Sequence, residues 1–274
     1  MDPQRALDVF DRQMRREARP DHPLTRVERV GAVTRQVGPG EMWNGVLWSG
    51  LGVDGGEDAD EVIARQVRDY AALGDVESFE WKLYSHDRPA DLGARLSAAG
   101  FVAEEPEALM VAEAEAIAAI PAPAPEGVEF VPVTDAAGVD LLARVHDQAF
   151  DNGVGDRIKV RLLAQLERAP ESVRAFVAMA GDEPVCAVRM DFNEGTDFVG
   201  LWGGGTVEAW RGRGIYRALV GHRARIAVER GYRYLFVDAS DQSRPILARL
   251  GFARLATTTP YEYHLKSPER AWRA

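Results

Sequence analysis

The sequence predicts an α+β protein made of two domains. Its 274 residues are more than one typical domain needs, and strand-like and helical patterns of apolar residues occur in both halves of the chain. Between the halves, proline alternates with alanine in residues 119–127, which favours an extended, semi-rigid connector. We therefore expect residues 1–118 and 128–274 to form the two domains, with residues 119–127 as the linker between them.

The N-terminal half begins with Asp2 and Pro3, a pair that is typical of a helix start. Leu7, Phe10 and Met14 then recur at helical spacing and predict one apolar helix face. The elements expected after this helix are strands at residues 30–37 and 42–51, a helix at 60–73 and a strand at 78–85.

The C-terminal half predicts its elements more clearly. Thr134 or Asp135 is placed to cap a helix whose apolar face includes Leu142 and Val145. Gly181-Asp182 separates two strand-like runs and is a strong hairpin signal. The elements expected here are a strand at residues 128–133, a helix ending near 150, a helix at 158–166, strands at 173–179, 184–192 and 198–207, a helix from 215, a strand at 234–238, a short helix and two closing strands.

The later parts of the two halves resemble each other. In each, a strand leads to an Arg-Pro pair, then to a helix containing Arg-Leu, then to Gly-Phe and a further strand. We infer an internal duplication, although strand–helix–strand units ending in Gly-Phe also arise by chance. The matching pairs are Arg88-Pro89 with Arg244-Pro245, and Gly100-Phe101 with Gly251-Phe252.

The most informative segment is Arg-Gly-Arg-Gly-Ile-Tyr at residues 211–216, between a glycine-rich strand pattern and a long helical pattern. The N–H groups of a helix's first turn have no partner within the helix, and the helix dipole adds positive charge there. Gly212 and Gly214 permit unusual backbone angles and close approach, while Arg211 and Arg213 add donors suited to phosphate oxygens. The segment therefore predicts a phosphate or pyrophosphate site; the alternative is a surface turn with two solvated arginines.

This segment resembles the acetyl-CoA-binding signature of the GNAT acyltransferases, Gln/Arg-x-x-Gly-x-Gly/Ala. Here it reads Arg211-x-x-Gly214-x-Tyr216, so a tyrosine replaces the last small residue. The order of strands and helices around it is also similar to the GNAT plan. The resemblance implies two GNAT-like domains, each with a mixed, mostly antiparallel central sheet flanked by helices. It also implies that acetyl-CoA or a related acyl-CoA is the acyl donor.

The resemblance further implies which residues hold the donor. The strand before the signature is expected to pair through its backbone with the pantetheine arm, and the amides of the signature are expected to hold the pyrophosphate. A serine, Ser240, stands where the family often has an asparagine. The expected cofactor-binding residues are Gly204, Gly205, Thr206, Arg211, Gly212, Arg213, Gly214, Ile215, Tyr216 and Ser240.

Acyl transfer to an amine needs a neutral amine, a donor for the oxyanion and a proton for the departing thiolate. The family often supplies that proton from a tyrosine, but Leu247 stands in its place here. Tyr216, Tyr261 and Tyr263 are possible substitutes, of which we select Tyr216, and Glu208 is the candidate base. Each is also explained as a packing or solvated residue. The same holds for five further candidates, Asp151, Asp156, His222, Trp202 and Trp210.

The matching segment of the N-terminal half, residues 52–60, keeps its glycines but has carboxylates in place of the arginines. Asp54, Glu57, Asp58 and Asp60 would repel a polyphosphate, which costs affinity. We therefore predict a degenerate N-terminal domain that binds no acyl-CoA.

Composition and charge exclude several kinds of partner. The net charge of −10 argues against a broad nucleic-acid surface. The single cysteine, Cys186, cannot form a disulfide within the chain, which fits a reducing cytoplasm. No apolar run approaches the length of a membrane span, and we find neither a signal-peptide pattern nor a Cys/His metal spacing. We expect a cytoplasmic monomer or homodimer that uses no metal.

The sequence therefore predicts an N-acetyltransferase that moves acetyl from acetyl-CoA to a primary amine of a small molecule or peptide. Two alternatives stay open. A non-catalytic acyl-CoA-binding or sensing protein would account for Leu247 and would bind acyl-CoA without releasing thiol. An interaction protein that has kept only the fold would tolerate charge reversal at Arg211 and Arg213.

Overall fold

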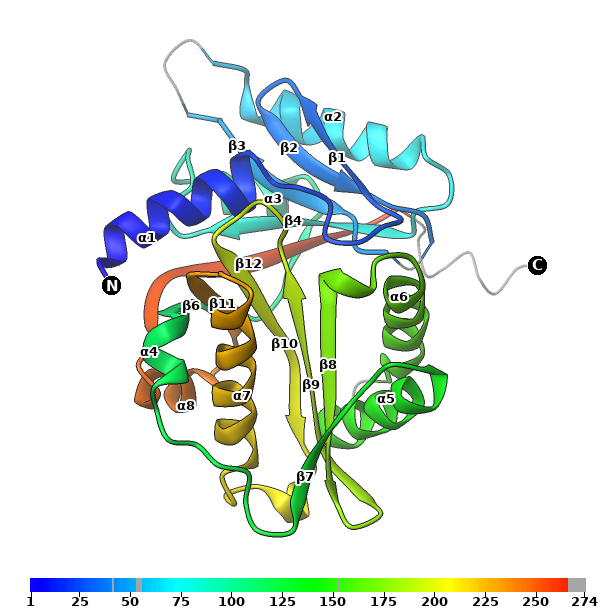
Figure 1. Ribbon diagram of the computed structural model, residues 1–274. Coiled ribbons are helices and arrows are strands. Elements are labelled where there is room, and N and C mark those ends of the chain that lie inside the picture. Colours follow the sequence, from blue (N-terminus) through cyan, green and yellow to red (C-terminus); the bar gives the residue numbers. More distant parts are fainter. Residues whose placement is uncertain (41, 53–55, 152, 266–274) are drawn as a thin grey trace, which may run out of the picture. The chain divides into compact units, whose positions relative to one another are not determined.

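The computed structural model describes residues 1–40, 42–52, 56–151 and 153–265, and the chain divides into two compact units (Figure 1). The C-terminal unit contains Met1–Pro3 and Met110–Arg254. The N-terminal unit contains Gln4–Leu109 and the segment that begins at Leu255. Each unit has helices and a mixed, mostly antiparallel set of strands, so the predicted α+β class is confirmed.

The N-terminal unit is built on β1, β2, β3, β4 and β12, in that order across the sheet, with the short β5 on β12. Neighbours are antiparallel except β3 and β4, which run parallel and pair only at residues 45 and 46 with 80 and 81. Tyr70, Phe79 and Trp81 lie at the centre of its core. The elements are α1 (Pro3–Phe10), the π-helical η1 (Asp11–Arg16), β1 (Arg26–Val30), β2 (Val33–Val37), β3 (Gly45–Ser49), α2 (Ala59–Ala71), β4 (Ser78–Tyr84), α3 (Leu92–Ala98), β5 (Val102–Ala103) and β12 (Ala253–His264).

The C-terminal unit has the strand order β6-β11-β10-β9-β8-β7, in which β10 runs parallel to β11 and β7 to β10 are antiparallel. The predicted hairpin joins β8 to β9 at Gly181, whose φ is 58°. Asp135 caps α5, because its carboxylate accepts a bond from the Gly138 amide at 2.9 Å. The elements are β6 (Glu107–Glu113), α4 (Ala114–Ala118), β7 (Val128–Pro132), α5 (Ala136–Phe150), α6 (Gly155–Arg168), η2 (Pro170–Ser172), β8 (Val173–Ala180), β9 (Glu183–Phe192), β10 (Phe198–Thr206), η3 (Glu208–Trp210), α7 (Ile215–Glu229), β11 (Tyr234–Ala239) and α8 (Arg244–Arg249).

Helices cover both faces of the strands in the C-terminal unit. Successive side chains of a strand point to opposite faces, so β8 contributes to two cores. Ala175 and Val177 pack with Leu142 under α5 and α6, whereas Phe176 packs with Leu219 under α7. In Figure 1, α5 and α6 accordingly lie on one side of β8 to β10 and α7 on the other.

The boundaries of the units differ from those of the predicted domains. Residues 119–127 connect α4 to β7 inside the C-terminal unit, so they do not separate the two units. The expected closing hairpin is one long strand, β12, which belongs to the N-terminal unit from Leu255 onward. Residues 258–264 pair one for one with β4, and Tyr261 and Tyr263 pack against the N-terminal core. A strand's own pattern predicts its faces but not the sheet that it joins.

Candidate functional site

In the C-terminal unit, β10 and β11 stop pairing part of the way along their length. Residues 198–200 of β10 pair with residues 234–236 of β11, and no further pair follows between them in the described residues. Beyond that point β10 has an irregular register with β9 between Trp202 and Gly205. The β11-facing edge of β10 therefore has no strand partner in its glycine-rich part. Such an edge can pair with an extended chain.

Two glycines of this irregular part, the β10 bulge, have aromatic rings against them. A Cβ on Gly204 would lie 2.5 Å from Cε2 of Tyr216, which comes from α7. A Cβ on Gly205 would lie 2.6 Å from Cε2 of Phe150, at the end of α5. Because real Cβ atoms do not approach so closely, a larger residue at either position would displace a ring. Packing against these rings therefore favours glycine at both positions.

The turn before α7 presents a row of backbone amides. Gly212 and Gly214 have φ values of 77° and 82°, and Gly214 is the N-cap residue of the helix. Among the described residues, no backbone carbonyl accepts from the amides of residues 212–217, and the first bond runs from Ala218 to Gly214 at 3.0 Å. No atom lies within 4 Å of a Cβ built on either glycine. Open amides at the positive end of a helix dipole are suited to bind an anion.

The two arginines of this turn are held by backbone carbonyls. Arg211 donates to the carbonyls of Thr206 and Ala149, each at 3.1 Å. Arg213 donates to Ala209 at 3.2 Å and lies over the ring of Trp210, 4.3 Å from its centroid. Both side chains are exposed, so their charges stay available beside the amides. The arrangement adds positive charge that no carboxylate neutralises in the part of the chain that the structure describes.

On the α7 side of the β10 bulge lies a group of neutral, titratable side chains. The phenol of Tyr216 faces the guanidinium of Arg223 and the thiol of Cys186. Burial raises the pKa of Tyr216, and Arg223 opposes this only in part. Burial also raises the pKa of Cys186 to about 11, although the Thr206 hydroxyl donates to its sulfur at 3.2 Å. Both groups are therefore protonated near pH 7.

Three other residues named from the sequence lie apart from this group. Ser240 is exposed just after β11, with its Oγ 3.4 Å from that of Ser243. Leu247 is completely buried on α8, so it is a core residue and cannot supply a proton. Glu208 is exposed in η3, where its carbonyl accepts from the amide of Arg211 at 3.1 Å.

Three further candidates are explained by capping, solvent exposure or packing. Asp151 is the C-cap residue of α5, in the left-handed conformation with a φ of 49°. The side chain of Asp156 is 97% exposed in the first turn of α6. His222 packs edge-on against Phe176, with 4.8 Å between the ring centroids. None of the three adds a functional group to the β10 bulge.

One buried histidine was not among the residues selected from the sequence. His146 on α5 is 8% exposed, and its Nδ1 has no hydrogen-bond partner in the described part of the chain. Burial lowers its pKa, Arg189 adds to this effect and Asp147 opposes it. The imidazole is therefore mostly neutral near pH 7 and can accept a proton. Its sequence signal is weak, because a lone histidine on an apolar helix face is most often a packing residue.

Charged and aromatic residues extend this region on the face that α5 covers. Arg189 on β9 lies opposite Trp202 on β10 and forms an ion pair with Asp191 at 3.1 Å. Trp202 packs edge-on against Phe236 of β11, at 5.5 Å between ring centroids. Trp202, one of the candidates named from the sequence, thus borders the point where β10 and β11 separate.

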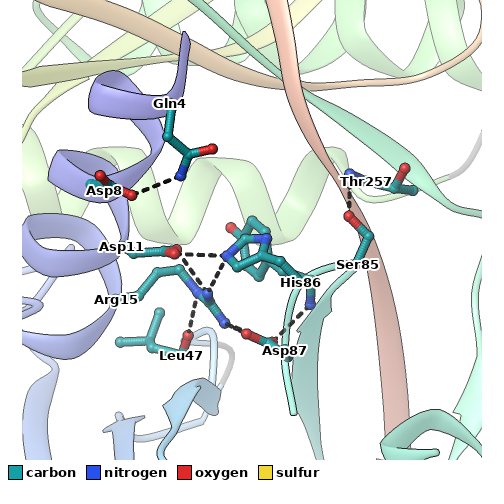
Figure 2. Close-up of polar contacts among 10 residues, drawn as sticks. Gln4, Asp8, Asp11, Arg15, Leu47, Ser85, His86, Asp87 and Thr257 are labelled. Carbon is teal, nitrogen blue, oxygen red and sulfur yellow. Dashed lines mark hydrogen bonds and ion pairs between the residues drawn. The ribbon is translucent and has the colours of Figure 1, made fainter. Parts of the chain in front are cut away.

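In the N-terminal unit, the parallel strands β3 and β4 also separate, but an arginine bridges them (Figure 2). Arg15 from η1 donates to the carbonyl of Leu47 on β3 at 3.1 Å. Its Nη2 donates to both carboxylate oxygens of Asp87, just after β4, at 2.7 Å each. Its Nη1 donates to Asp11 at 2.8 Å, and Asp11 lies 2.7 Å from Nε2 of His86. The side chain of Arg15 therefore links β3 to the segment after β4 at the place where the two strands separate.

The acidic segment of the N-terminal half is only partly described. Residues 53–55, with Asp54 among them, lie outside the described residues. Glu57 accepts a bond from the Ala32 amide at 2.8 Å, and Asp58 caps α2 by accepting from two amides. These two carboxylates therefore stabilise local structure, in addition to carrying negative charge.

Comparison with known proteins gives the family of this architecture. Residues 139–252 match the model of the acetyltransferase (GNAT) family. A GCN5-related N-acetyltransferase from Kribbella flavida superposes with a TM-score of 0.63 at 17% identity, covering 95% of this chain and 93% of that one. A tandem GNAT protein from the clavulanic acid biosynthesis pathway gives 0.60 at 15% identity, over 89% and 85%. A GCN5-related N-acetyltransferase from Sphaerobacter thermophilus gives 0.55 at 16% identity, over 86% and 77%.

The fold and the amide-lined turn define an α+β domain of the acyltransferase type. Residues 139–252 of the C-terminal half match the GNAT family, and the chain as a whole has the fold of tandem GNAT proteins. GNAT domains typically bind acetyl-CoA and act as acetyltransferases. The search of curated proteins finds none that matches this sequence.

Two further features were considered in the described residues, a membrane-spanning helix and a metal-binding cluster, and these residues contain neither. None of the helices there is both long and apolar enough to cross a membrane. In the same residues, no group of three or more His, Cys, Asp or Glu side chains is placed to hold a metal ion.

Proposed function

We propose that the C-terminal unit transfers an acetyl group from acetyl-CoA to a primary amine of a small molecule or peptide. The observation that carries this proposal is the row of open amides at residues 212–217, beside the unpaired edge of β10. Coenzyme A offers a pyrophosphate to the amides and an amide-containing pantetheine arm to the strand edge. The two features therefore match the two ends of one ligand.

In this proposal the amides of residues 212–217 hold the pyrophosphate, and Arg211 and Arg213 add charge beside it. The backbone of residues 204–206 pairs with the pantetheine arm, because that edge has no strand partner. Ser240, exposed at the end of β11, is available to donate a hydrogen bond. Aromatic rings lie against the glycines at 204 and 205, but no strand pairs with this edge of the backbone in the described residues.

The attacking amine must be neutral, although only about one in a thousand free amines is neutral at pH 7. A nearby base raises this fraction at the moment of reaction. Glu208 stays a prediction for that role, but its carboxylate is exposed in η3. His146 is buried on the α5 side of the β10 bulge with an unpartnered Nδ1 among the described residues, and we propose it as the stronger candidate.

We further propose that the N-terminal unit binds no acyl-CoA. Arg15 joins Leu47 of β3 to Asp87 after β4, across the place where an extended ligand would enter between these strands. The carboxylates of residues 57–60 add negative charge on the chain before α2. One acyl-CoA per chain is therefore the expected stoichiometry.

The second candidate function is a non-catalytic acyl-CoA-binding or sensing protein. The observation that favours it is the complete burial of Leu247, at the position where the family resemblance implies a proton-donating tyrosine. This function needs the amide-lined turn but no base and no acid.

Calorimetry with acetyl-CoA, combined with an assay of free thiol against a panel of amines, separates these possibilities. We expect one site per chain and thiol release that depends on the amine. Binding without thiol release from any amine would favour the sensing function, and the absence of binding to any acyl-CoA would rule out both. Arg211→Glu is expected to weaken binding about tenfold, about 1.4 kcal/mol. Arg225→Glu, an equal charge change at an exposed position further along α7, should leave it within about twofold.

A further inference from the structure

Arg223 on α7 is an almost completely buried cation that has no carboxylate partner among the described residues. Its side chain is 1% exposed, Nε donates to the carbonyl of Leu219 at 3.2 Å, and Nη1 donates to that of Arg189 at 3.0 Å. Nη2 has no hydrogen-bond partner among the described residues, and none of their carboxylates forms an ion pair with this guanidinium. Since a lone buried charge is costly, such an arrangement requires a compensating role.

The guanidinium lies under the β10 bulge. Arg189, which accepts the bond from Nη1, pairs with Trp202, the last residue of β10 before the register becomes irregular. Cys186 and Leu219 belong to the core on the α7 side, which places Arg223 on the same face as Tyr216. The cation therefore lies next to the part of β10 whose outer edge has no strand partner.

Two neutral acids face Arg223, the phenol of Tyr216 on α7 and the thiol of Cys186 on β9. The thiol is completely buried, whereas Tyr216 is only partly buried and its ring rests against Gly204. Of the two, Tyr216 is therefore the one that is in part exposed and that contacts the glycine-rich part of β10. A negative charge formed on its oxygen would lie beside the unneutralised guanidinium.

On the basis of the proposed function, we propose that Tyr216 donates its hydroxyl proton to the sulfur of coenzyme A as the carbon–sulfur bond breaks. Arg223 stabilises the phenolate that remains. Tyr216 is thus a catalytic residue, and Arg223 is a positioning residue that acts through it. This assignment explains together why residue 216 is a tyrosine rather than a small residue, why Gly204 is small, and why Leu247 can be apolar.

The step balances in atoms and electrons. The amine nitrogen bonds to the acetyl carbon, and the carbonyl π pair moves onto oxygen. When that pair returns, the carbon–sulfur bond breaks, its electrons stay on sulfur, and sulfur takes the proton of Tyr216. The new amide nitrogen gives its extra proton to a base or to water, and the phenolate regains a proton from water. The products are the N-acetyl amine and the free thiol of coenzyme A.

The test compares Tyr216→Phe, Arg223→Met and Arg223→Lys in the full chain, with Tyr232→Phe as a matched control. Tyr232 is another partly buried tyrosine of this unit, which packs against Phe192 at 5.4 Å between centroids. We expect Tyr216→Phe and Arg223→Met to lower kcat about 100-fold while the KM for acetyl-CoA changes less than about threefold. Arg223→Lys keeps the charge and should recover at least about tenfold of the loss, and Tyr232→Phe should keep kcat within about twofold.

A second readout does not depend on turnover. Tyrosine ring ¹³C NMR of the ligand-free protein follows the titration of Tyr216, which the Tyr216→Phe spectrum identifies. The charged or titratable groups that face this phenol are Arg223 from α7 and Cys186 from β9. Loss of the guanidinium in Arg223→Met should move the pKa of Tyr216 upward, and Arg223→Lys should move it less.

The outcomes distinguish the inference from the function on which it rests. Wild-type protein that never releases thiol overturns the proposed function, and the NMR titration then decides whether the Tyr216–Arg223 coupling exists. Wild-type turnover combined with an unchanged kcat in Tyr216→Phe overturns the role of the tyrosine. An unchanged titration of Tyr216 in Arg223→Met overturns the role of the arginine.

Discussion

Both units of this molecule bury an arginine close to the place where two parallel strands separate, but the arginines have opposite partners. Arg15 in the N-terminal unit binds the carboxylates of Asp87 and Asp11 (Figure 2). Its guanidinium also lies over the ring of Tyr84, 4.0 Å from the centroid. Arg223 in the C-terminal unit donates to two backbone carbonyls and faces the hydroxyl of Tyr216, and no carboxylate of the described residues pairs with it. The buried guanidinium of the N-terminal unit is thus neutralised by carboxylates. In the C-terminal unit, no carboxylate of the described residues neutralises the buried guanidinium.

The difference indicates that a buried arginine can have two different roles in related surroundings. A buried ion pair with complete hydrogen bonds holds the elements around it in one arrangement, and removing one partner is strongly destabilising. A buried cation without an anion lowers stability in the resting protein but favours any step that creates negative charge beside it. Arg15 therefore links the strands of its unit, whereas the role proposed for Arg223 is to stabilise negative charge formed on Tyr216.

The largest expected difference is in stability, between Arg15→Met and Arg223→Met. Arg15→Met leaves Asp87 buried without its cation and should lower the free energy of unfolding by about 3–5 kcal/mol. Arg223→Met removes a charge that had no anion, so stability should stay within about 1 kcal/mol or increase. Urea denaturation of the full chain measures both, and Arg225→Met, at an exposed site, is the control. Equal losses in the two variants would show that the two arginines play the same role.

The next largest effect concerns the amide-lined turn. Gly214→Ala forces a residue with a side chain to a φ of 82°, which costs about 1–2 kcal/mol and turns the amides away from a bound anion. We expect affinity for coenzyme A to fall about tenfold in calorimetry. Gly181→Ala introduces similar strain at a φ of 58° in the β8–β9 turn and should leave the affinity unchanged. Similar losses of affinity in the two variants would contradict a specific role for residues 212–217.

A smaller effect is expected from acid on the N-terminal cluster. Burial raises the pKa of Asp11, but the hydrogen bond to His86 and the charge of Arg15 outweigh this, so the net shift is downward. A carboxyl whose native pKa is depressed stabilises the fold above its unfolded pKa, and this contribution is lost as pH falls through the native value. The free energy of unfolding should therefore decrease below about pH 4. In Asp11→Asn this part of the pH dependence should be weaker, and an unchanged slope would count against the pairing.

The smallest effect is expected from Glu208→Gln. Because the carboxylate is exposed in η3, we expect kcat/KM to fall by less than about threefold. His146→Ala should lower it more, by at least about tenfold, if the buried imidazole takes the proton of the amine. A loss of about 100-fold in Glu208→Gln would instead identify Glu208 as the base.

Local sequence determined the parts of the site that depend on local backbone geometry. The glycines and arginines of residues 211–216 predicted an anion-binding turn, and the structure has both glycines at positive φ before α7. Capping by Asp135 and the hairpin at Gly181 were predicted for the same reason, since each depends on a few neighbouring residues.

The residues that local patterns missed depend on contacts between distant segments. Arg223 and His146 look like ordinary members of amphipathic helices until the strands beneath them are placed. Arg15 and Asp87 are 72 residues apart, and nothing near either one predicts their ion pair. The membership of β12 is of the same kind, because the partner strand β4 lies far away in the sequence.

By itself, the sequence determined the α+β class, the family resemblance and the position of the amide-lined turn, because these follow from short-range spacing and backbone preference. Only the tertiary structure decided which unit receives the last strand, which buried arginine has a carboxylate and which has none. Burial and charge pairing depend on contacts between residues that are distant in the sequence. The roles proposed for Tyr216 and Arg223 could therefore be inferred only from the tertiary structure.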